Sequence, residues 1–149
     1  MQVLGITVEG SIIFSGCISV SSYLADTPVP YKVSAMVFVV SPDWTLRTMV
    51  RAQLREANIE AMGMENTRDM AEALAGGLAP SLIVLDGVEL KNAAARKALE
   101  RVARIAGVLV VNSAVTPAPP VPGTEVMRRP VRIQDIVAWV LAKPRRTKR

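Results

Sequence analysis

The chain has 149 residues, of which half are apolar and only 4% are aromatic. This length allows one domain with a hydrophobic core and is too short for a second complete domain. The chain contains no histidine and a single cysteine, Cys17. That composition excludes imidazole catalysis, Ser-His and Cys-His nucleophile systems, zinc clusters and intramolecular disulfides. Any chemistry must therefore use carboxylates, hydroxyls, lysine or arginine.

The net charge of +5 comes from the C-terminal end. The segment KPRRTKR (143–149) carries five of the 18 basic residues, and the other 13 are balanced by 13 acidic residues. A terminal run of like charge is typical of a solvated tail. We therefore expect a neutral body with a basic tail and no nucleic-acid partner, with contact through the tail as the minor alternative.

Residues 1–35 differ from the remainder of the chain, because serines and hydrophobic residues are scattered there without a helical or strand period. A signal peptide needs basic residues before its apolar run, and this segment has Glu9 instead. The run is also too short and too polar to cross a membrane. We expect a loosely packed or poorly ordered N-terminal extension, no membrane segment and a cytoplasmic protein.

Regular structure is expected from Met36 onward. Short apolar runs predict strands at 37–40, 61–64, 82–85 and 108–111, followed by a short fifth strand at 125–127. Asn66 or Thr67 is expected to cap the second helix, and the third helix to begin near Lys91. Four helices are predicted from the apolar faces Leu46, Met49, Val50, Leu54 and Ala57; Met70 and Leu74; Ala95, Ala98, Val102 and Ile105; and Ile133, Ile136, Val137 and Val140.

The order of these elements predicts the fold class. Strands that are apolar throughout are covered on both faces, and strands that alternate with helices form right-handed crossovers in a parallel sheet. We predict an α/β fold over residues 36–142, with an open, doubly wound sheet of five parallel strands.

A candidate site is expected beyond the carboxyl ends of the strands, where ligands collect in such sheets. Asp86 ends the third strand, so that a lone carboxylate follows a buried apolar run. The other residues at this edge are Ser41, Pro42, Asp43, Asn112, Ser113, Arg129 and Pro130. We predict that Asp86 faces a hydroxyl and a guanidinium across one small pocket.

From Met36 to Leu141 the chain resembles the receiver domain of bacterial two-component response regulators, whose fold is CheY-like and flavodoxin-like. The resemblance rests on the element order, on the strand-ending Asp86, on NSA at 112–114 and on RRP at 128–130. It implies that Asp86 is the phosphoacceptor candidate and that Ser113 is the hydroxyl that contacts the phosphoryl group. It also places Arg129 where the family has a lysine.

The first strand departs from the family pattern. Ser41 and Pro42 stand where the family has the acid pair that holds Mg²⁺, and neither supplies the carboxylate oxygen that a hard cation prefers. Asp43 is expected to cap the first helix by accepting from the amides of Thr45 or Leu46. We therefore expect no cofactor and no metal, with Asp43 and Asp86 as the remaining candidate ligands.

The second half departs as well. The resemblance implies a helix between the fourth and fifth strands, but TPAPPVPG lies there, and its prolines predict a polyproline-like loop in place of this fourth helix. Val126 occupies the position of the family's switch aromatic. Arg129 can clamp Asp86 in a bidentate ion pair. Such a pair could imitate a signalling state or be purely structural, and both readings stay open.

Three functions are compatible with these residues. The preferred one is a stand-alone pseudo-receiver in signal transduction that binds a protein without phosphorylation and is not an enzyme. Its partner would be a histidine kinase or a downstream effector, and a homodimer is a further option. The alternative is a working response regulator, phosphorylated on Asp86 by a histidine kinase in a phosphorelay. The second alternative is a nucleotide- or cofactor-binding α/β enzyme, although SPDWT lacks the glycines of a phosphate cradle.

Overall fold

The computed structural model describes residues 36–144, so the expectations for residues 1–35 and for 145–149 of the tail lie outside the described residues. The strands are β2 (Val37–Val40), β3 (Ala61–Met64), β4 (Leu82–Asp86), β5 (Gly107–Asn112) and β6 (Thr124–Arg128). The helices are α3 (Trp44–Glu56), α4 (Thr67–Ala75), the 3₁₀ segment η1 (Gly87–Lys91), α5 (Ala93–Val102) and α6 (Ile133–Ala142).

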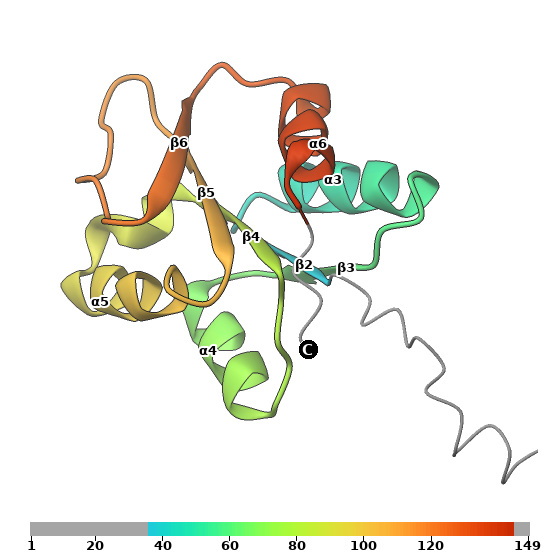
Figure 1. The fold of residues 1–149 in the computed structure, drawn as a ribbon. Coiled ribbons are helices and arrows are strands. Elements are labelled where there is room, and N and C mark those ends of the chain that lie inside the picture. The colour runs from blue at the N-terminus through green and yellow to red at the C-terminus, as the bar shows by residue number, and fades with distance from the viewer. Residues whose placement is uncertain (1–35, 145–149) are drawn as a thin grey trace, which may run out of the picture. The chain divides into compact units, whose positions relative to one another are not determined.

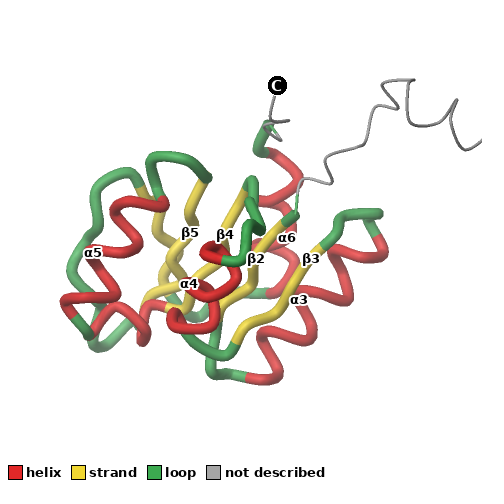
Figure 2. The backbone as a smooth tube through the Cα atoms, turned by 90° about the horizontal axis from the view of Figure 1, so that it is seen from below, coloured by secondary structure: helices red, strands yellow, loops and turns green. Residues whose placement is uncertain are grey.

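The five strands form one parallel sheet in the order β3-β2-β4-β5-β6. Helices α3 and α6 cover one face of this sheet, and α4 and α5 cover the other (Figures 1 and 2). The predicted open α/β fold with five strands is therefore confirmed. Among the described residues, no helix is both long and apolar enough to cross a membrane.

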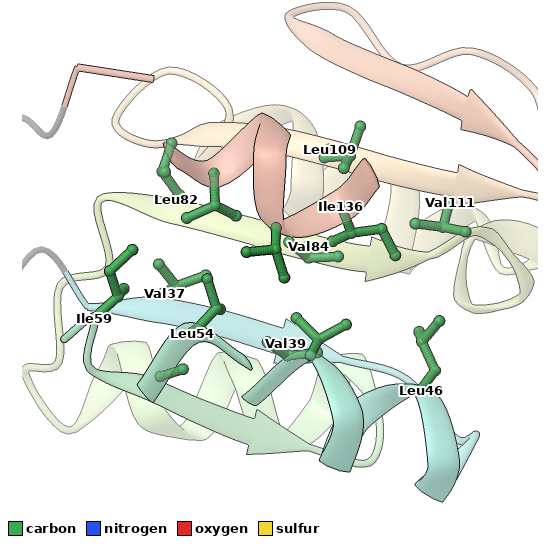
Figure 3. Packing of buried hydrophobic residues seen from close by; sticks show 14 residues of the cluster. Val37, Val39, Leu46, Leu54, Ile59, Leu82, Val84, Leu109, Val111 and Ile136 are labelled. Atoms are coloured by element: carbon green, nitrogen blue, oxygen red, sulfur yellow. The ribbon is translucent and has the colours of Figure 1, made fainter. Parts of the chain in front are cut away.

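Each central strand contributes to two hydrophobic clusters, because alternate side chains point to opposite faces of a sheet. Val37 and Val39 of β2 pack toward α3 and α6, whereas Phe38 and Val40 pack toward α4 and α5. Figure 3 shows the first cluster, in which Leu54 and Ile136 from the two helices lie over the strands. Burial on both faces explains why β2, β4 and β5 are apolar without alternation.

Two residues predicted to be on buried helical faces are exposed. Met49 is 46% exposed, because α3 turns the ridge Leu46, Val50 and Leu54 toward the sheet and leaves Met49 at its flank. Ile105 is 64% exposed, because α5 ends at Val102 and Ile105 lies in the turn before β5. The third predicted helix also begins later than expected, since η1 comes before it.

The helix starts follow from their capping residues. The side chain of Asn66 accepts from the amide of Asp69 at the start of α4, and that of Asn92 accepts from Ala94 and Ala95 at the start of α5. These bonds satisfy amide groups that have no partner within the helix. Asn66 is thus the N-cap of α4, one of the two residues predicted for that role.

The segment between β5 and β6, residues 113–123, contains no helix. We call it the proline loop. Its Val121 is buried at 6% exposure and packs into the cluster beneath α4 and α5. The loop then turns at Gly123, whose φ of 83° is readily adopted only by glycine. The predicted replacement of a helix by a proline-rich loop is confirmed.

Candidate functional site

Asp86 lies at the carboxyl end of β4 with 7% of its surface exposed. Its Oδ2 accepts two hydrogen bonds, one from the Ser41 hydroxyl and one from Arg129 Nη2, each 2.9 Å long. Its Oδ1 accepts from the backbone amide of Val88 at 3.1 Å, which caps η1. Both carboxylate oxygens are therefore occupied by donors from three different segments.

Arg129 reaches Asp86 because of where β6 ends. The backbone amide of Arg129 donates to the carbonyl of Asn112 at 2.9 Å and continues the β5–β6 pairing by one residue. The next peptide bond, to Pro130, is cis, and Pro130 itself is exposed. The Arg129 side chain is 37% exposed and that of Asp86 is 9% exposed, so the ion pair joins a partly exposed guanidinium to a buried carboxylate. The pair is made through Nη2 alone and is not the bidentate clamp that the sequence allowed.

Asp86 and Arg129 line a hollow of about 380 Å³. The other lining residues are Gly87, Val88, Lys91, Asn112, Ser113 and Thr116. Ser113 thus lines the same hollow as Asp86. Its Oγ, however, accepts from the backbone amides of Val115 and Thr116 at 3.2 Å, so the hydroxyl closes a local turn.

The Asp43 side chain caps a helix and forms no hydrogen bond with Asp86 in the described range. It is the N-cap of α3, and its Oδ1 accepts from the amides of Thr45 at 2.9 Å and Leu46 at 3.3 Å. Its own amide donates to Ser41 Oγ at 3.0 Å. The structure therefore brings Ser41, Asp86 and Arg129 together and leaves the Asp43 carboxylate outside the group.

The residues at this edge do not fit a magnesium ion. A Mg²⁺ site needs oxygen ligands in near-octahedral geometry. Here the Asp43 carboxylate is committed to a helix cap, the Ser41 hydroxyl donates to Asp86, and Asp86 is paired with a guanidinium. Within residues 36–144, no group of three or more acidic, histidine or cysteine side chains could hold a metal.

Asn112 has a role that the sequence did not reveal. This side chain, 6% exposed, accepts from the amide of Ala118 at 2.8 Å and from that of Ser113 at 3.2 Å. Its Nδ2 donates to the Ala118 carbonyl at 3.3 Å, so both backbone groups of Ala118 are bound. A Cβ on Gly87 would lie 2.6 Å from Asn112 Oδ1. The glycine after Asp86 is the one sequence signal that a neighbouring side chain comes close here.

A second polar cluster joins β6 to the end of α6. The carboxylate of Glu125 accepts from the ammonium of Lys143 and from the indole N–H of Trp139. The Lys143 ammonium lies 5.3 Å from the centroid of the Trp139 ring. These two hydrogen bonds, the one from Lys143 foremost, hold the pKa of Glu125 below its usual value of 4.5. Lys143, which was predicted to begin the solvated tail, is therefore attached to the sheet edge.

No family model matches the sequence, and no curated protein matches it either. Solved structures do match its fold. The chemotaxis response regulator CheY4 of Vibrio cholerae is 19% identical with a TM-score of 0.60, over 73% of this chain and 98% of that one. A response regulator receiver protein from Pseudomonas putida is 14% identical with a TM-score of 0.59, over 72% and 96%.

The fold is thus that of the CheY-like receiver domains of response regulators. The same likeness extends to an enzyme: the lysine decarboxylase LdcF of Francisella novicida is 11% identical with a TM-score of 0.59, over 73% of this chain and 17% of that one. Because one fold serves proteins of different function, the function must be argued from the side chains of the site.

Proposed function

We propose that this chain is a pseudo-receiver domain in signal transduction, which binds a protein partner without being phosphorylated. The observation that carries the proposal is the state of Asp86. Its Oδ2 is held by Ser41 and Arg129 and its Oδ1 by the Val88 amide. Hydrogen bonds from these three donors hold the carboxylate in one position and withdraw charge from both oxygens, which makes it a weaker nucleophile.

The charge balance at the site supports the same conclusion. Transfer of a phosphoryl group to a carboxylate brings two anions together, so cations are needed on the transferred group. The residues at the end of β2 do not fit Mg²⁺. Arg129 already neutralises Asp86, and Lys91 at the rim of the hollow is exposed. This arrangement favours a permanent ion pair.

The binding surface in this proposal comprises β6, α6 and the proline loop. Val126, at the position of the family's switch aromatic, is 46% exposed and has no ring to swing. We propose a histidine kinase or a downstream effector as the partner and a cytoplasmic location, with no enzymatic activity of its own. A homodimer through the same surface stays a prediction.

The test is the intact mass of the full chain after incubation with acetyl phosphate, with and without Mg²⁺. We expect no phosphoryl adduct in either condition. A receiver domain known to accept phosphate serves as the positive control, and the Asp86→Asn variant as the matched negative control. An adduct on the wild-type chain that disappears in Asp86→Asn would contradict the proposal and identify a working response regulator.

A further inference from the structure

The backbone of the proline loop is restricted by its own sequence. From Thr116 to Pro122, every residue either is a proline or directly precedes one. Proline fixes φ near −65°, and the residue before a proline is displaced from the helical region toward extended conformations. The residues 117–121 accordingly belong to no helix, strand or turn. Both restrictions favour the polyproline II conformation for this segment.

The loop is fixed to the domain at two positions three residues apart. Ala118 is held through its amide and its carbonyl by the Asn112 side chain and packs against the core, and Val121 is buried. A polyproline II helix has three residues per turn, so residues i and i+3 share one side. Ala118 and Val121 thus form the inner side of the loop.

The remaining positions form the outer sides. Pro117 and Pro120 make one pair at the same spacing, and Pro119 and Pro122 make the other; all four are exposed. Two proline pairs spaced by three residues match the PxxP pattern that aromatic-lined grooves recognise. The anchors at Ala118 and Val121 hold these pairs in place before any partner arrives, which lowers the entropy cost of binding.

Strand β6 extends the same surface. A hollow of about 660 Å³ lies between the loop and this strand, and Val126 and Arg128 line it together with Pro117, Pro119 and Pro120. Arg128 is exposed and forms no salt bridge with any residue of the described range. A cation beside a polyproline ligand favours a partner groove with a carboxylate at its edge.

We infer that the proline loop is a ligand for a protein domain whose aromatic-lined groove binds polyproline II segments and carries an acidic residue opposite Arg128. This inference names the partner class for the proposed binding function and rests on it. The proposed ligand is the segment that takes the place of the helix implied by the family resemblance.

The experiment is calorimetric titration of the full chain with three probes: an SH3, a WW and an EVH1 domain. We expect at least one probe to bind. Replacing both Pro119 and Pro120 by alanine should weaken that binding by about fivefold or more, the effect of removing an interface anchor. Pro42→Ala is the matched control, since Pro42 is an exposed proline between β2 and α3 that does not line this hollow, and it should leave the affinity unchanged. Circular dichroism of each variant checks that the fold is intact.

Charge reversal at Arg128 provides a second readout. Arg128→Glu should weaken binding and reduce its dependence on salt, because an ion pair across the interface is screened by ions. Absence of binding by all three probes to the folded wild-type chain would overturn the inference. So would binding that the double proline variant leaves unchanged.

The two proposals can fail separately. If no phosphoryl adduct forms and no probe binds, the pseudo-receiver function stands and this partner class is wrong. If an adduct forms and a probe binds in a proline-dependent way, phosphorylation independence is wrong and the loop is still a polyproline ligand.

Discussion

The ion pair between Asp86 and Arg129 should stabilise the fold measurably, and Arg129→Ala is the change that tests this. Exposed ion pairs contribute about 0–1 kcal/mol, whereas breaking a fully buried pair costs about 3–5 kcal/mol. The Asp86 side chain is 9% exposed and that of Arg129 is 37% exposed, which places this pair between the two cases. We expect Arg129→Ala to lower the free energy of unfolding by about 2 kcal/mol.

The assay is urea unfolding of the full chain, followed by circular dichroism, for wild type, Arg129→Ala, Asp86→Asn and the double variant. The cycle should give a coupling energy of about 1–2 kcal/mol, as residues in direct contact do. Arg128→Ala is the control, since this neighbouring side chain is exposed and should change stability by less than about 0.5 kcal/mol. Equal costs for the two arginine variants, or a coupling near zero, would refute the reasoning.

Two further predictions concern other sites. Gly87→Ala should lower the free energy of unfolding by about 1–3 kcal/mol, because the new Cβ would lie 2.6 Å from Asn112 Oδ1 and 3.2 Å from Asn112 Cα. Thermal unfolding measures this change. Gly76→Ala is the control and should be nearly neutral, since its Cβ would have no contact closer than 3.4 Å. Glu125→Gln should destabilise the chain at neutral pH. Because the folded state lowers the pKa of Glu125 below 4.5, this stabilisation is present above that value and is lost as the pH falls through the folded pKa. A wild-type-minus-variant difference that stays constant as the pH is lowered would contradict this account.

The sequence predicted the sheet well because its signals are local. Short apolar runs such as 37–40 and 82–85 correspond to strands that are buried on both faces. The helix faces were predicted less accurately. Met49 lies within the apolar period of α3 yet is exposed, because the buried ridge of that helix is narrower than its apolar stripe. Periodicity gives the direction of a face and leaves its width undetermined.

The site was predictable in part. Parallel strands end at one edge, so Ser41, Asp86 and Arg129 could be expected to meet, and they do. A hydroxyl at a strand end often bonds nearby backbone, as Ser113 does. The hydrogen bonds of Asn112 to Ala118 could not be expected, because they depend on the path of the chain after β5. Asn112 and Ala118 are six positions apart in an irregular segment, and no recurring sequence pattern predicts such a contact.

The restricted proline loop also limits how a signal could pass through this domain. An effector shifts an equilibrium only as far as it binds one conformation more tightly than another. Four prolines, the buried Val121 and the Asn112 hydrogen bonds leave the loop with few alternative conformations that could be populated. Binding of a ligand at Asp86 would therefore change the conformation of the proline loop very little. A partner bound there would be controlled by its concentration and not by the occupancy of the acidic site.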